Sequence, residues 1–138
     1  MDLARKKALL AEAEQLAAVL GQYHTPSSGE GLDPARIAEV SRFLSVSPDL
    51  ADLNAFLTLL PGSFHARMSR SAEPQLREVA RVVRPLIRRV HDRDEMRYVL
   101  EWAKRILQTA ERGAGSLEAA PRGGPPRRGP PPQGRSRG

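Results

Sequence analysis

The spacing of the apolar residues constrains the fold of this chain more than any other feature. In five segments, Leu, Val, Ile and Ala recur every three or four residues, which is the repeat of one face of an α-helix. No segment of useful length alternates apolar and polar residues, as a half-buried β-strand would. The five segments are residues 2–22, 34–45, 47–60, 71–90 and 93–112. We therefore predict an all-α bundle of about five helices, with a short helix hairpin between longer N- and C-terminal helices.

Signals for helix ends agree with this division. Three N-terminal signals precede apolar runs: Asp33-Pro34, Ser47-Pro48 and the capping-box-like pair Asp92 and Glu95. Pro61-Gly62 and Gly113 are expected to end the helices that precede them. Residues 63–72 carry no helical repeat, and we expect them to be irregular.

Pro85 interrupts the fourth segment. Proline lacks the N–H that a helix interior requires, and it disfavours the α conformation at the preceding residue, Arg84. A kink or a break is therefore expected, and the sequence leaves the choice between them open. On a helical wheel of ~100° per residue, Pro85 projects away from the apolar face, so its ring is not expected to disturb the core.

The composition changes abruptly after residue 112. Residues 113–138 are rich in proline, glycine and arginine and hold almost nothing that a core could bury. Such a segment cannot bury enough apolar surface to offset the entropy of folding. We therefore predict two parts, a helical bundle domain at 1–112 and a disordered basic tail at 113–138.

The positive charge is concentrated in the C-terminal half. The chain has 22 Lys and Arg against 16 Asp and Glu, a formal net charge of +6. Residues 1–60 hold five basic and eight acidic side chains, whereas residues 61–112 hold twelve and seven. A basic balance favours anionic partners such as nucleic acid, an anionic membrane surface or an acidic protein.

A stripe of arginines runs along the fourth segment. Arg77, Arg81, Arg84 and Arg88 are four, three and four residues apart, which places them within a band of roughly 60° on the helical wheel. Arginine suits forked contacts to phosphate or carboxylate. The charge is extended toward the last helix by Arg89, Arg93 and Arg97. These seven residues are the predicted anion-binding site, although an ordinary solvated face explains the same pattern.

Two further groups are candidates for partner contacts. Tyr98 and Trp102 lie four residues apart on the flank of the last apolar face, where they can stack on a base, fill a pocket of a partner or pack under a neighbouring element. The tail carries Arg122, Arg127, Arg128, Arg135 and Arg137, in a setting that resembles nucleic-acid-binding disordered arms. The tail has no aromatic residue for stacking, and a plain linker explains it equally well.

Residues 36–48, RIAEVSRFLSVSP, resemble the first helix and turn of helix-turn-helix regulators of the mercury-resistance-regulator and excisionase type. The matching residues are Ile37, Glu39, Val40, Leu44, Val46 and Ser47, and Ser45 stands where that family has glycine. The resemblance implies that a DNA-reading helix comes next. That segment, PDLADLNAFLTLL, contains two aspartates and no basic residue, and acids facing phosphates repel them. We therefore expect an ordinary helix hairpin.

Known catalytic and metal-binding patterns are missing. Without cysteine, the chain has no disulfide, thiolate nucleophile or cysteine metal ligand. His91-Asp92 resembles the paired ligand of the all-α HD metal hydrolases, but no aspartate comes after Asp94 to complete their ligand set. We expect no enzymatic activity, no metal, no cofactor and no small-molecule substrate. No run of apolar residues is long enough to span a membrane, and the N-terminus does not resemble a signal peptide, so a cytoplasmic location is expected.

The sequence supports two functional hypotheses. The first is a small binding module that contacts an anionic partner, nucleic acid above all, through the arginine stripe and the basic tail. The second is a protein–protein adaptor or small subunit that docks on a larger partner through the Tyr98 and Trp102 flank and the helix hairpin, without touching nucleic acid. Association with an anionic membrane surface is a weaker third option, because the arginine-rich segment lacks the Trp or Phe that anchors such helices.

Overall fold

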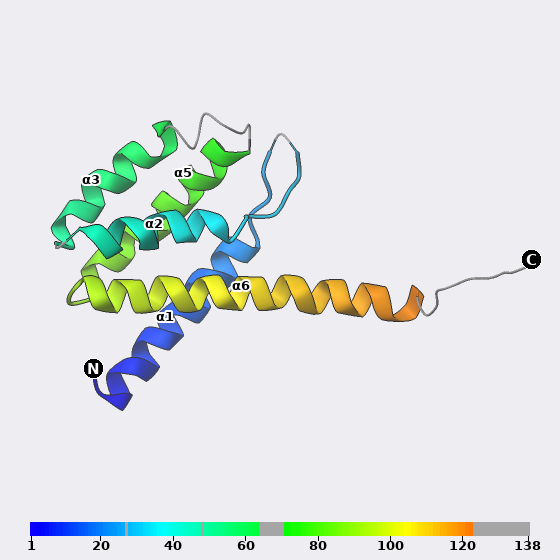
Figure 1. Cartoon of the computed structure of the whole chain (residues 1–138), viewed down its shortest axis with the longest axis horizontal. Coiled ribbons are helices and arrows are strands. Elements are labelled where there is room, and N and C mark those ends of the chain that lie inside the picture. Colours follow the sequence, from blue (N-terminus) through cyan, green and yellow to red (C-terminus); the bar gives the residue numbers. More distant parts are fainter. Residues whose placement is uncertain (27, 48, 64–70, 123–138) are drawn as a thin grey trace, which may run out of the picture. The chain divides into compact units, whose positions relative to one another are not determined.

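The computed structural model describes residues 1–26, 28–47, 49–63 and 71–122, with backbone only from 111 onward. This part of the chain is all-α (Figure 1), as the sequence predicted. Its elements are α1 (Leu3–Gly21), α2 (Ala35–Val46), α3 (Ala51–Leu59), the 3₁₀ helix η1 (Leu60–Gly62), α5 (Ala72–Val83), the 3₁₀ helix η2 (Arg84–Arg88) and α6 (Arg93–Arg122).

The chain divides into two compact units, Met1–Leu107 and Gln108–Gly138. The core and all the side-chain contacts described below belong to the first unit. Its largest fully buried apolar residues come from five helices, so α1, α2, α3, α5 and α6 each turn one face inward as the helical repeat requires. These residues are Leu9, Leu20, Ile37, Val40, Leu44, Leu53, Leu57, Leu76, Val79, Met96 and Leu100.

The last helix does not end at Gly113, and that prediction was wrong. The helix α6 continues to Arg122. Glycine ends a helix when it adopts the left-handed conformation, but at other positions it costs only about 1 kcal/mol relative to alanine. Residues 116–120, SLEAA, are mostly good helix formers, and the first proline after Pro85 is at 121. Residues 123–138, most of the predicted tail, lie outside the described residues.

The predicted helix hairpin is formed by α2 and α3. An aspartate precedes each helix by two residues, and its carboxylate accepts a hydrogen bond from the first N–H of the helix: Asp33 from Ala35 at 3.0 Å, and Asp49 from Ala51 at 2.9 Å. The helix α3 starts three residues after Pro48, close to the predicted Ser47-Pro48 start, and Pro48 itself lies outside the described residues. The two helices are held together by the rings of Phe43 and Phe56, which stack with centroids 4.1 Å apart.

The fourth predicted helix is broken at Pro85. The α-helix ends at Val83, and residues 84–88 form a 3₁₀ helix. Because proline cannot donate to the carbonyl four residues back, the chain tightens into i to i+3 hydrogen bonds. Pro85 is exposed and Leu86 beside it is buried, so the ring points away from the core as predicted.

The first and last helices run in the same general direction. Near their starts, Arg5 of α1 forms an ion pair with Glu95 of α6 at 2.6 Å. Near the end of α1, Gly21 lies close to Leu107, whose side chain would be 3.4 Å from a Cβ added to the glycine. In Figure 1 the two helices cross, α1 in blue and α6 in yellow. Contacts at both ends fix the register of this pair.

A partly buried polar contact links α2 to α6. The buried Ser41 hydroxyl donates a hydrogen bond of 2.7 Å to Glu101, and this bond is the main cause of a lowered pKa of the Glu101 carboxyl.

Hydrogen bonds to charged groups contribute about 1.5 to 3 kcal/mol to the free energy of unfolding. Because Glu101 is also paired with Lys104, we expect Ser41→Ala to lower the free energy of unfolding by about 1 to 2 kcal/mol in urea titration. The exposed Ser45→Ala is the control, and equal stability of the two variants would contradict this role.

Candidate functional site

Four of the seven predicted arginines surround one concavity. It has a volume of about 420 Å³ and is lined by Arg81, Arg84, Pro85, Arg88 and Arg89. Arg81 comes from the last turn of α5, and the others come from η2 and the residue after it. In a 3₁₀ helix, residues three apart lie over one another, so Pro85 and Arg88 share a face. Pro85 therefore lines the concavity beside Arg88 and contributes an apolar surface among the cationic side chains.

The side chains of Arg81 and Arg84 are held in place by neighbours. Arg81 makes two hydrogen bonds to Glu78, at 2.9 and 2.6 Å, which raise the pKa of its guanidinium. Arg84 donates to the Asn54 amide oxygen at 2.7 Å and to the Thr58 hydroxyl at 3.3 Å. These two partners belong to α3 and are uncharged, so the positive charge of Arg84 is oriented without being neutralised.

The other two arginines are less restrained. Arg88 is exposed and has no hydrogen-bond or ion-pair partner among the described residues. Arg89 pairs with Glu12 of α1 at 3.3 Å, and its side chain is 53% exposed. The four guanidinium groups that line the concavity are therefore paired with only two carboxylates, those of Glu78 and Glu12. The balance favours binding of an anion with more than one negative charge.

The remaining three predicted arginines do not line this concavity. Arg77 lies nearer the N-terminal end of α5 and pairs with Glu73 at 3.1 Å. Arg93 donates to the carbonyl oxygens of Leu44 and Ser47, at 3.3 and 2.7 Å, and so satisfies the end of α2. Arg97 is half-buried, and its Nε has no partner within the described part of the chain. Tertiary contacts have thus given Arg93 a structural role that its spacing did not reveal.

Tyr98 and Trp102 lie beside the core rather than at the arginine-lined concavity. Both are half-buried and pack against core residues, and their ring centroids are 6.4 Å apart at an angle of 56°. The guanidinium of Arg105 lies over the Trp102 ring at 5.2 Å. Neither aromatic residue lines the concavity. Their use as a partner surface stays a prediction.

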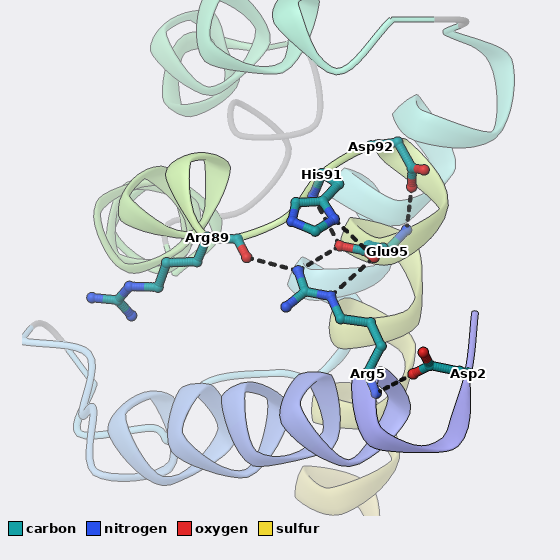
Figure 2. Close-up of polar contacts among 6 residues, drawn as sticks. All are labelled: Asp2, Arg5, Arg89, His91, Asp92 and Glu95. Atoms are coloured by element: carbon teal, nitrogen blue, oxygen red, sulfur yellow. Dashed lines mark hydrogen bonds and ion pairs between the residues drawn. The ribbon is translucent and has the colours of Figure 1, made fainter.

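A second polar cluster, which sequence reasoning missed in part, lies where α1 meets the start of α6 (Figure 2). Glu95 is only 7% exposed and accepts two hydrogen bonds from Arg5, at 3.0 and 2.6 Å, and one from the backbone N–H of His91 at 2.8 Å. Its own N–H donates to Asp92 at 2.9 Å, which confirms the predicted cap. The part that was missed is Arg5, which is 90 residues away in the sequence.

This cluster is linked to the arginine-lined concavity through the backbone of Arg89. The carbonyl oxygen of Arg89 accepts a hydrogen bond of 3.0 Å from Arg5, while the Arg89 side chain extends away from the cluster (Figure 2). The guanidinium of Arg5 also lowers the pKa of the Glu95 carboxyl to about 2, and the His91 N–H contributes in the same direction. The ionised cluster therefore holds the C-terminal end of η2 against α1 and α6.

The helix that would read DNA in a helix-turn-helix protein offers no positive charge. The exposed residues of α3 are Ala51, Asp52, Asn54, Ala55, Thr58 and Leu59. Two of them, Asn54 and Thr58, hold Arg84. This face of the hairpin therefore positions an arginine of the concavity and does not itself present cations to phosphate.

The described residues contain no group of three or more acidic or histidine side chains that could hold a metal ion. None of their helices combines the length and apolar character that crossing a membrane requires.

No family model matches the sequence, and no curated protein or solved structure shows significant similarity to it.

Proposed function

We propose that this protein is a non-enzymatic binding module that holds the phosphates of a nucleic acid at the arginine-lined concavity. The observation that carries the proposal is the convergence of Arg81, Arg84, Arg88 and Arg89 on one hollow of about 420 Å³. Guanidinium forks match phosphate oxygens in pairs, and Arg84 is already oriented by uncharged partners. A cytoplasmic location stays a prediction of the sequence.

The ion pairs at the rim are compatible with this role. Arg81 is 67% exposed and pairs with Glu78 on the same helix, and Arg89 pairs with Glu12 across to α1. The carboxylate partners are less exposed, at 15% for Glu78 and 26% for Glu12, and a guanidinium has five N–H donors. Each arginine can therefore keep its carboxylate and donate its remaining N–H groups to phosphate. Arg88 has no described partner, so all its donors are available.

The test is a binding titration of the full-length chain with labelled DNA and RNA across a salt series. Neutralising about four phosphates predicts that log K falls with log salt with a slope of roughly −3 to −4. Replacing all four lining arginines by glutamine should remove this dependence and weaken binding by at least about 100-fold near 0.05 M salt. Absence of binding by the wild type at about 100 μM protein and 0.15 M salt would overturn the proposal.

A control variant must separate the effect of the protein's net charge from the effect of where the arginines lie. A variant with Lys6, Lys7, Arg42 and Arg77 changed to glutamine loses the same four charges at exposed positions away from the concavity. It should keep most of the affinity, and an equal loss in both variants would mean that only overall charge matters. A third variant replaces the five tail arginines, Arg122, Arg127, Arg128, Arg135 and Arg137, with glutamine. If it alone abolishes binding, the tail is the binding element and the concavity is not.

A further inference from the structure

A second groove adjoins the arginine-lined concavity. It has a volume of about 200 Å³ and shares Arg81, Pro85 and Arg89 with it. Its other lining residues come from α1 and from the end of α5 and η2: Glu12, Gln15, Leu16, Val19, Val82 and Leu86. One continuous surface thus passes from a cationic hollow into a groove between helices.

The groove differs from the concavity in chemical character. Leu16 and Leu86 are buried, Val82 is half-buried, and Val19 is 39% exposed, so much of the lining is aliphatic. Polar groups also line the groove: the Gln15 amide offers two donors and an acceptor oxygen, and the Glu12 carboxylate, which pairs with Arg89, offers acceptors. A ligand that suits this groove has an apolar face and a polar edge, and it is attached to an anionic part that reaches the arginines.

We propose that the groove receives an unpaired nucleobase of a strand whose phosphates lie in the arginine-lined concavity. The inference rests on the proposed function and names its substrate class, single-stranded nucleic acid. A base has apolar faces, which suit Val19, Val82 and Pro85, and a hydrogen-bonding edge, which suits Gln15. The guanidinium planes of the shared Arg81 and Arg89 can stack on such a base while they contact its phosphate.

The geometry of the groove also selects the state of the strand. In a duplex the base faces are stacked on each other and the edges are paired, so no base can enter the groove without leaving the helix. Single strands offer bases freely, and a groove that contacts base faces does not select among them strongly. The protein should therefore prefer single-stranded to double-stranded ligands and show little sequence preference.

The experiment compares three ligands of equal length and phosphate number per strand at one salt concentration: a mixed-sequence single-stranded DNA, the same DNA as a duplex, and a strand of abasic sugar-phosphates. The wild-type protein should bind the single strand at least about 10-fold more tightly than the other two. The abasic strand keeps the phosphates and removes only the bases. It therefore tests the groove without changing the protein.

A matched pair of variants tests the groove from the protein side. Val19→Gln places a neutral polar side chain on the groove wall, and Val46→Gln makes the same change at a 78% exposed valine on α2, outside the groove. Val19→Gln should weaken single-strand binding about 3- to 10-fold and leave duplex binding unchanged, and Val46→Gln should alter neither. Thermal unfolding followed by circular dichroism verifies that both variants fold.

Failure of the inference is distinguishable from failure of the proposed function. Equal, salt-dependent binding of single strand, duplex and abasic strand would overturn the nucleobase groove and leave the phosphate site intact. Tighter binding of the duplex would overturn the groove in the same way. Absence of salt-dependent binding to all three ligands would overturn both proposals.

Discussion

Replacing Glu95 by glutamine is expected to lower the free energy of unfolding by about 2 to 3 kcal/mol at pH 7. The carboxylate is nearly buried, accepts a forked pair of hydrogen bonds from Arg5 and accepts a third from the His91 backbone. A pKa of about 2 in place of 4.5 corresponds to about 3 kcal/mol. The expected loss is slightly smaller than this, because the Arg5 side chain is 27% exposed and solvent screens part of the interaction.

The effect should depend on pH in a defined direction. Because the pKa of Glu95 is lower in the folded state than in the unfolded state, its stabilisation is complete above about pH 5 and is lost as the pH falls through about 2. The difference between wild type and Glu95→Gln should therefore shrink toward zero between pH 5 and pH 2. The lowered pKa of Glu101 adds acid sensitivity of the same sign to both proteins.

Urea unfolding at pH 7, 5, 3.5 and 2 measures the free energy of unfolding of both proteins and its dependence on pH. The matched control is Glu73→Gln, which removes an exposed ion pair with Arg77 and should change stability by less than about 1 kcal/mol. A stability difference for Glu95→Gln that is the same at every pH would show that the ionised carboxylate is not the source. A loss of stability no larger than that of the control would show that the cluster contributes little to the free energy of unfolding.

The second large effect is expected at Gln75, a residue that the sequence did not single out. It is 2% exposed, and its amide makes four hydrogen bonds. The amide nitrogen donates to the Thr25 hydroxyl at 3.0 Å and the Gly31 carbonyl at 3.3 Å. The amide oxygen accepts from the Asp33 N–H and the Arg36 guanidinium, each at 3.1 Å. One side chain of α5 thus holds the connection between α1 and α2 in place.

Gln75→Leu keeps the approximate volume and removes all four bonds. It leaves the buried Thr25 hydroxyl and nearby backbone groups without their partner, and such groups cost about 1 to 3 kcal/mol each when water cannot reach them. We expect a loss of about 2 to 4 kcal/mol in the free energy of unfolding, because part of the connection can hydrate once it is released. Amide exchange of residues 22–34 should accelerate more than that of α6.

The control for this variant is Gln22→Leu, which changes an exposed glutamine in the same connection. It should alter stability by less than about 0.5 kcal/mol. If Gln75→Leu leaves amide exchange in residues 22–34 unchanged, the side chain does not hold the connection. Gln75 lines neither the concavity nor the groove, so Gln75→Leu, if it still folds, should retain nucleic-acid binding.

Helices and their starts were predictable because the interactions that define them are local. Buried apolar residues recur every three or four positions in α5 and α6, and the caps at Asp33 and Asp92 use bonds that span two or three residues. Gly113 shows the limit of such signals. Whether a glycine ends a helix depends on its backbone conformation and on the residues after it, and the glycine itself specifies neither.

The candidate site was predictable only in part. Spacing predicted that Arg77, Arg81, Arg84 and Arg88 share one side of a helix, and three of them line the concavity together with Pro85, the residue at the predicted break. Spacing did not reveal that Arg84 is oriented by α3 or that Arg93 is committed to the carbonyl groups at the end of α2. It also did not reveal the groove beside α1, because both walls of a groove are known only once two helices are packed together.

By itself, the sequence determined that this chain is helical, where most of its helices begin, and which side of each faces the core. Those properties arise from interactions between residues two to four apart, which a single chain segment already contains. Only the tertiary structure decided which polar groups meet. Arg5 binds Glu95 across 90 residues, and Gln75 binds Thr25 across 50, because helix packing brings them together. The same packing divides seven similar arginines between structural roles and one cationic concavity, since each guanidinium bonds whichever acceptor its neighbours present.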